Sequence, residues 1–444
     1  MYDRPRARFR LPTIGFLAAA AVAFSPVLTA QDVEHMGMAP MTMTSALFPG
    51  LPMSREGSGT SWQPDSSPVY AWHALAGSWT LMIHGSAFLR YTSQDAGRAG
   101  TRGGSRLDAP NWVMIMAQPP RREWGGFSLR GMFSLDRLTE GGSGYPLLFQ
   151  TGESWKGEAL VDRQHPHDLV SELSVSYGRS LGPNAGVFLY FGLPGEPALG
   201  PPAFMHRPSS LSNPDAPLGH HLQDSTHITF GVLTGGARYK RLKLDASVFT
   251  GREPDENRFD FDRPRFDSWS ARLSLNPSDR FALQVSHGFL HSPEAREPEV
   301  DVRRTTASLM MSRPLRPGAD WTTTFVWGVN TSSDRPATHS LLADSEAALG
   351  RTSVYARIEF VQRQAHDLKL NELGDRILPI GALTVGAAWR LGTNRYFQLH
   401  GGAQAAFYHV VDERAPAYGK RPFSFEVYFR MSPLRASGMG LMHH

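Results

Sequence analysis

The sequence predicts an all-β protein, a closed antiparallel transmembrane β-barrel of about sixteen strands. Segment after segment of about ten residues alternates apolar and polar side chains, which is the period of a strand and the length that crosses a bilayer when tilted. Full charges stand in the middle of the polar faces, where a water-filled lumen accepts them. Short turns and long polar loops follow one another in strict alternation, as they do between the two sides of an outer-membrane barrel.

The first thirty residues have the pattern of a secretory signal peptide. Four arginines lie between residues 4 and 10, an apolar stretch spans 11–24, and residues 28–30 offer a cleavage site. The apolar stretch is too short for a good membrane anchor. We therefore exclude residues 1–30 from the fold.

Composition narrows the classes of function. The net charge is +4, and the first thirty residues carry +3 of it, so the mature chain is near +1 and has no basic excess for binding nucleic acid. The chain has no cysteine, which excludes disulfides and thiolate metal sites. After residue 30 no run of eighteen apolar residues occurs, which excludes helical membrane spans.

Residues 31–78 form a Met/Pro-rich segment without sustained periodicity. The simplest expectation is a flexible periplasmic arm. Trp62, Tyr70 and Trp72 make it more aromatic than a linker requires. We therefore also expect part of 51–78 to dock into the periplasmic mouth as a partial plug.

Strand alternation begins at residue 79 and continues to residue 430. It is clearest in 79–91, 127–137, 280–290, 320–330 and 421–430. The polar faces carry charges expected to point into the lumen: Arg130, Glu172, Arg272, Arg357, Glu359, Arg390 and Glu426. Rings of mixed charge indicate either a narrow polar pore or a salt-bridged, packed interior.

Aromatic residues near strand ends are typical of the interfacial girdles of membrane barrels. The residues expected in these girdles are Trp79, Tyr91, Trp112, Tyr177, Trp321 and Trp389.

The connections divide into two classes. Short turns are predicted at 119–126, 181–186, 235–241, 276–280, 316–320, 349–351 and 392–395. Long loops are predicted at 92–110, 138–168, 194–224, 251–266, 291–301, 331–337, 364–380 and 410–420. Because 331–337 is short for its class, the strand at 338–348 is the least secure, and without it and a partner the barrel has fourteen strands.

Over residues 79–430 this architecture resembles the porin-like outer-membrane β-barrel proteins of Gram-negative bacteria. The resemblance implies a cell outer-membrane location with both termini periplasmic, contact with lipid and lipopolysaccharide, and insertion by the barrel-assembly machinery. It also implies a monomer or small homo-oligomer that acts as a channel or passive transporter for small polar solutes or ions. Such proteins usually end on an aromatic residue of the last strand, whereas here a tail, residues 431–444, follows the barrel.

Both termini carry methionine and histidine, whose thioether and imidazole groups suit Cu(I). The residues are His35, Met36, Met38, Met41, Met43, Met439, Met442, His443 and His444. The first group resembles the Met/His-rich periplasmic arm of copper-resistance outer-membrane barrel proteins. The alternative function is therefore a barrel that handles copper or another metal. The simpler explanation of these residues is a disordered tail that happens to contain methionine.

The long loops carry a second candidate metal site. Pro166 favours an extended His165, so His165 and His167 face the same way. The full set is His165, His167, Asp168, His206, His220, His221, Asp224 and His227, a mixture that suits zinc, Cu(II) or nickel. The alternative is that these groups pair with each other and with arginine, folding loops 138–168 and 194–224 inward as a constriction.

Signs of catalysis are few. The sequence has no Gly-x-Ser-x-Gly elbow before a helix and no His-Glu-x-x-His pair. A barrel hydrolase is the enzyme alternative, and a channel without catalytic residues or a required cofactor is the expectation.

Overall fold

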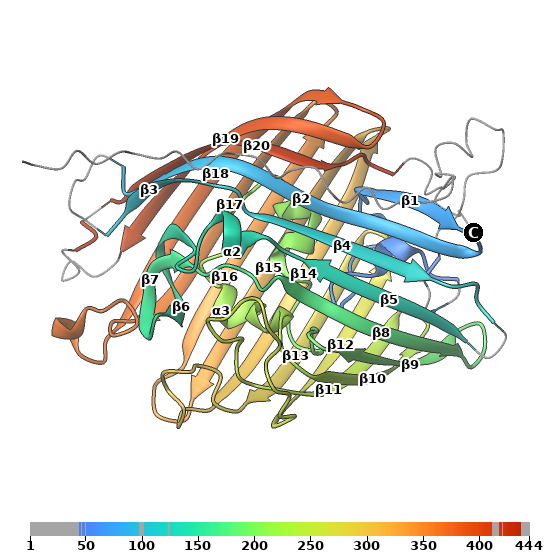
Figure 1. Ribbon diagram of the computed structural model, residues 1–444, viewed down its shortest axis with the longest axis horizontal. Helices are drawn as coiled ribbons and strands as arrows, with labels where there is room; N and C mark the ends of the chain where they lie inside the picture. Colours follow the sequence, from blue (N-terminus) through green and yellow to red (C-terminus); the bar gives the residue numbers. More distant parts are fainter. Residues whose placement is uncertain are drawn as a thin grey trace, which may run out of the picture.

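The computed structural model describes residues 44–45, 47–48, 50–96, 102–122, 125–410, 417–419 and 421–436, and it shows a barrel of steeply tilted strands (Figure 1). The wall consists of β2 (Trp79–Gln94), β3 (Gly104–Asp108), β4 (Asn111–Gln118), β5 (Gly126–Phe133), β8 (Val170–Ser180), β9 (Ala185–Gly192), β10 (Val232–Tyr239), β11 (Leu242–Phe249), β12 (Ser268–Ser278), β13 (Phe281–Leu290), β14 (Val302–Arg316), β15 (Ala319–Ser332), β16 (Thr338–Leu349), β17 (Thr352–Gln364), β18 (Ile377–Thr393), β19 (Phe397–Val410) and β20 (Phe423–Pro433).

Short elements lie outside this wall. They are β1 (Ala71–Ala76), the hairpin of β6 (Tyr145–Trp155) and β7 (Glu158–Gln164), α2 (Asp136–Thr139), α3 (His220–Gln223), and the 3-10 turns η1 (Met53–Arg55), η2 (Phe204–His206), η3 (Pro208–Ser210), η4 (Ser225–His227) and η5 (Asn371–Leu373). Among the described residues, no helix combines the length and apolarity needed to cross a bilayer.

The wall closes because its first strand pairs with its last. The β2–β20 pairing runs from Ala87 opposite Met431 to Ser93 opposite Phe425, and every neighbouring pair is antiparallel. β3 and β4 share one position beside β2, and β1 is a short addition, so the wall has sixteen positions. The predicted closed barrel, its strand number and its alternation of turns and long loops are confirmed, including the strand at 338–349.

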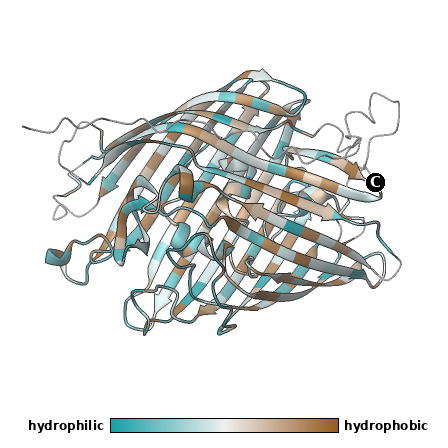
Figure 2. Cartoon of the chain, in the orientation of Figure 1, coloured by the Kyte–Doolittle hydropathy of each residue, from teal (hydrophilic) through white to brown (hydrophobic). Residues whose placement is uncertain are grey.

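The exterior of the barrel is apolar. Outward positions along the strands leave large side chains exposed, such as Leu244 at 57 % and Ile358 at 60 %, and apolar and polar positions alternate along each arrow (Figure 2). A closed barrel with this surface is a membrane-spanning protein of the outer-membrane type, because lipid rewards an apolar face and tolerates no open sheet edge.

Trp112 corrects one expectation about the aromatic girdles. Trp79, Trp321 and Trp389 are exposed on the outer surface, as expected. Trp112 instead packs inside, with its ring centre 5.2 Å from that of His84 and 4.6 Å from that of His206. The reason is strand parity: Trp112 lies opposite Ser86 on the inner face, although it stands near a strand end.

Three segments fill much of the lumen. The first is the end of the predicted arm, residues 44–69, in which Met53, Ser54 and Arg55 are buried. It ends beside the last strand, because Tyr70 bridges Arg435 and the Ala436 amide donates to the Val69 carbonyl. The second is the β6–β7 hairpin, and the third is the connection 193–231 between β9 and β10. Part of the arm thus lies within the barrel.

The hairpin departs from the expected loop at 138–168. Its apolar residues join the inner wall in a buried cluster that includes Leu148, Phe149, Leu218, Leu378 and Tyr408. The lumen therefore contains a hydrophobic core beside its charged groups. A run such as Tyr145–Phe149 gains more by burial against the wall than it would in solution.

Candidate functional site

Histidines from two distant loops meet in the lumen. His165 and His167 follow β7, whereas His220, His221 and His227 belong to the connection 193–231. The ring centre of His220 lies 5.1 Å from that of His227 and 6.2 Å from that of His165. The ring centre of His167 lies 5.5 Å from that of His227. None of the five is more than 9 % exposed, and together we call them the histidine cluster.

Local structure presents these side chains. His165 and His167 flank a proline in an extended stretch, and their ring centres are 6.3 Å apart. His220 opens the single turn of α3, which places Asp224 one turn later on the same face. The His220 Nδ1 atom is 2.7 Å from Asp224 Oδ1.

Four of the five rings are oriented through Nδ1. His167 Nδ1 is 2.7 Å from Asp136 Oδ2, His165 Nδ1 is 3.1 Å from Glu153 Oε1, and His227 Nδ1 is 2.9 Å from the Asp224 carbonyl oxygen. The Nε2 atoms of His165, His167, His220 and His227 are buried and have no hydrogen-bond partner among the described residues. Carboxylate on one nitrogen and a free lone pair on the other is the usual arrangement of metal-binding histidine.

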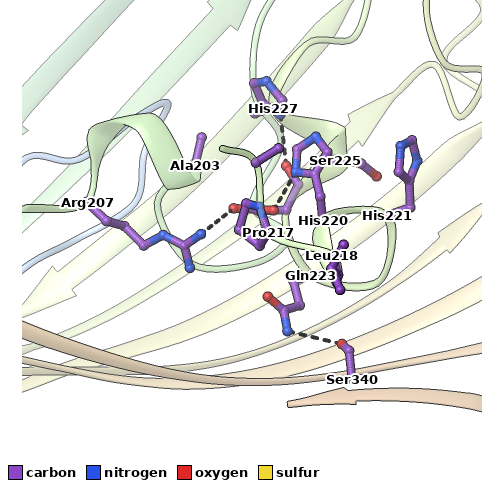
Figure 3. Close-up of polar contacts among 12 residues, drawn as sticks. Ala203, Arg207, Pro217, Leu218, His220, His221, Gln223, Ser225, His227 and Ser340 are labelled. Atoms are coloured by element: carbon purple, nitrogen blue, oxygen red, sulfur yellow. Dashed lines mark hydrogen bonds and ion pairs between the residues drawn. The ribbon is translucent and has the colours of Figure 1, made fainter. Parts of the chain in front are cut away.

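Burial disfavours the charged form of three of the five imidazoles. Burial lowers the pKa of His165, His220 and His227, in the case of His227 well below its usual range, with further lowering from His220 and His167. Burial alone would raise the pKa of Asp224, but Arg207 and His220 outweigh it and the pKa falls to about 2. The contact of Arg207 with this carboxylate, at 3.1 Å, is drawn in Figure 3. Neutral imidazole is the form that binds metal.

The outer side of the cluster holds a compact set of ligand atoms. His221, Glu253 and Glu294 each place one such atom within 4.8 Å of the others. Glu253 Oε1 is 3.3 Å from His221 Nδ1, and both nitrogens of His221 are buried without a hydrogen-bond partner in the described part of the chain. An acidic cavity of about 130 Å³, lined by Glu153, Glu253 and Glu294, adjoins this set.

Two of the predicted ligands lie elsewhere. Asp168 pairs with Arg258, its Oδ2 being 3.2 Å from Nη1, and does not reach the imidazoles. His206 stacks with His84 and Trp112 outside the cluster. The residues predicted to bind copper all lie outside the described residues: His35, Met36, Met38, Met41, Met43, Met439, Met442, His443 and His444.

The predicted lumen charges lie on the inner face, and four of them, Arg130, Arg272, Arg357 and Glu359, bind the inward-folded segments. Arg130 reaches Glu56 and the Gly59 carbonyl of the arm. Arg272 reaches Thr60 of the arm, the Gly200 carbonyl of the loop and Asp245. Arg357 bonds Asp344 and the Asp215 carbonyl, and Glu359 accepts a hydrogen bond from the Leu218 amide. Glu172 accepts a hydrogen bond from Tyr190, and Glu426 accepts one from Gln404. Arg390 lies opposite His400.

Sequence reasoning missed the acidic partners of the cluster. Asp136, Glu153, Glu253 and Glu294 come from three loops, and no spacing in the sequence connects them with the histidines. The one available signal was the number of carboxylates in loops 138–168 and 251–266 beside a loop rich in histidine.

Comparisons with known proteins found similarity among solved structures only. No family model and no curated protein matches the chain. Similar solved structures include OmpF of Salmonella typhi in complex with daunomycin, with a TM-score of 0.48 and 11 % identity over 80 % of this chain and 98 % of that one. An anion-selective porin from Comamonas acidovorans has a TM-score of 0.48 and 11 % identity over 80 % of this chain and 99 % of that one. OmpT, an outer membrane protein of Vibrio cholerae folded in vitro, has a TM-score of 0.45 and 8 % identity over 80 % of this chain and 100 % of that one. Scores this low transfer no property of those proteins to this chain.

Proposed function

We propose that the protein is an outer-membrane channel or passive transporter for small polar solutes or ions, narrowed by segments that fold into its lumen. The supporting observation is a closed barrel of sixteen positions with an apolar exterior and a charged inner wall. Barrels of this size enclose an aqueous passage unless it is filled. Here the arm, the hairpin and loop 193–231 occupy much of that passage, so we expect a small conductance.

Single-channel recording in a planar bilayer tests this proposal. Purified protein that shifts its gel mobility on heating, as intact barrels do, is expected to give small, ohmic conductance steps. The acidic cavity beside the histidine cluster favours cations, so reversal potentials in a salt gradient should show cation preference. A correctly folded barrel that never conducts under any salt or voltage contradicts the proposal.

A second candidate function is the handling of a divalent transition metal. It is favoured by the set of His221, Glu253 and Glu294, because one imidazole with two carboxylates suits zinc and leaves room for exchangeable ligands. The neighbouring imidazoles, whose Nε2 atoms are free, would provide further binding positions for the metal ion along its path through the lumen. The resemblance of the terminal segments to copper-resistance barrels concerns Cu(I) and stays a separate prediction.

Zinc titration of the purified protein tests the second candidate. We expect one tightly bound Zn²⁺ per chain, and we expect the paired change His221→Gln with Glu253→Gln to weaken it by at least about tenfold. His291→Gln is the matched control, because His291 pairs with Asp301 at the surface and is half exposed. Equal zinc affinity in the unchanged protein, the double variant and the control would show that His221, Glu253 and Glu294 only pack the loops together.

A further inference from the structure

A second internal cavity, of about 90 Å³, lies between the arm, the inner wall and loop 193–231. Methionine is the most frequent residue type in its lining. Five methionines line it: Met53 from the arm, Met82, Met114 and Met116 from the wall, and Met205 from the loop. Two histidines, His84 and His206, complete the set.

The register of the wall brings these side chains together. On neighbouring strands β2 and β4, Met82 lies opposite Met116 and His84 opposite Met114. On the next strand, β5, Met132 lies opposite Met114. All stand on the inner face of the barrel, where many other positions carry serine, threonine or charged residues. A patch of thioether side chains is therefore unusual on this otherwise mostly polar inner face.

The imidazoles point to a ligand. The ring centre of His84 is 5.6 Å from that of His206, and both pack on Trp112. The Nε2 atom of His84 is buried and finds no hydrogen-bond partner within the described ranges. A buried ring nitrogen left without a partner is costly unless something else occupies its lone pair.

Ordinary core packing explains these features poorly. Methionine often fills gaps in cores because it is unbranched and adaptable. A core filled for that purpose closes around the space, whereas here five flexible side chains leave a cavity next to an unsatisfied nitrogen. Of the charged residues in the lining, Glu56 pairs with Arg130 and Arg207 pairs with Asp224, so their charges are compensated and leave the thioethers and imidazoles as the available donors.

We propose that this cavity is a binding site for Cu(I), held by imidazole nitrogen from His84 and His206 and by methionine sulfur. Soft thioether donors select Cu(I) over the harder divalent ions. A single positive charge also costs less to bury than a double one. The site is distinct from the histidine cluster, whose nitrogen and oxygen donors suit divalent metals. It does not depend on the channel proposal, since an ion can be retained whether or not the lumen conducts.

The test is competition for Cu(I) between the purified full-length protein and a chromogenic Cu(I) chelator, without oxygen and with ascorbate. We expect one Cu(I) per chain to resist the chelator and to show copper–sulfur scattering in X-ray absorption. The double change Met114→Leu with Met116→Leu preserves volume, and we expect it to weaken retention by at least about tenfold. His84→Gln is expected to act in the same direction. Met310→Leu is the control, a buried inner-face methionine of β14 outside the cavity lining.

A separate variant tests the contribution of the terminal Met/His segments. A variant with leucine at Met36, Met38, Met41, Met43, Met439 and Met442 keeps the cavity and removes those thioethers. We expect it to retain the chelator-resistant ion. If this variant loses Cu(I) while the Met114/Met116 variant keeps it, or if no Cu(I) resists the chelator, the proposal is wrong. Gel mobility after heating verifies that each variant is folded, and conductance recorded in parallel reports on the channel proposal separately.

Discussion

A barrel that lacks residues 196–228 should conduct far more current than the full-length protein. Gly195 and Thr229 already form an antiparallel bridge, with both N–O distances 3.0 Å, so a two-residue Asn-Gly turn can join them. The wall pairing from Gly192 opposite Val232 onward does not involve the deleted residues. Planar-bilayer recording should show a several-fold larger conductance step, because an unfilled barrel of sixteen strands leaves an aqueous channel.

The deletion should be tolerated by the wall. Arg357 and Glu346 now bond loop residues, but water entering the lumen would hydrate these charges instead of leaving them stranded. Deletion of residues 371–375, which are exposed apart from the half-buried Leu373, is the control and should leave conductance unchanged. If the barrel without 196–228 folds and stays closed, even when the arm is also removed, the lumen is not a passage and the channel proposal fails.

Arg90→Met should give the largest loss of stability of any single charge removal in the wall. The Arg90 guanidinium is fully buried between Asp108 and Asp215, each 2.7 Å away, with Glu426 at 3.5 Å. It also lies 3.9 Å from the ring centre of Tyr145. One cation thus ties the seam between β2 and β20 to the hairpin and to loop 193–231. Its removal leaves three buried carboxylates without their counter-charge, at a cost of about 3–5 kcal/mol.

Urea unfolding of the folded barrel in detergent measures this effect. Arg241→Met is the matched control, because Arg241 pairs with Asp279 at 3.6 Å while both side chains are about half exposed. The control should change the free energy of unfolding by less than about 1 kcal/mol. Adding Asp215→Asn to Arg90→Met should recover part of the loss. Equal effects of Arg90→Met and Arg241→Met would show that the buried network contributes little to stability.

The strands of the wall could be predicted from local patterns in the sequence. Alternation with a period of two separates a lipid face from a lumen face, and this local pattern needs no knowledge of distant contacts. It placed Arg130, Arg272 and Arg357 on the inner side and located the short turns, although residues 235–239 of the turn predicted at 235–241 belong to β10. The Pro166 context also indicated that His165 and His167 face the same way. These features are written in neighbouring residues, which is why they could be predicted.

The contacts that hold the arm and the loops in the lumen could not be predicted from local sequence patterns, although their inward folding was among the expectations. The pairs Thr60–Asp245 and Tyr70–Arg435 join parts of the chain that lie far apart in the sequence, and no local period records them. The same holds for Glu253 beside His221 and for Met205 beside Met114. Whether a loop folds inward depends on the charges and apolar surface that the completed wall offers it. That surface exists only after the barrel closes. The contacts of the segments that carry the candidate sites therefore appear only in the three-dimensional structure.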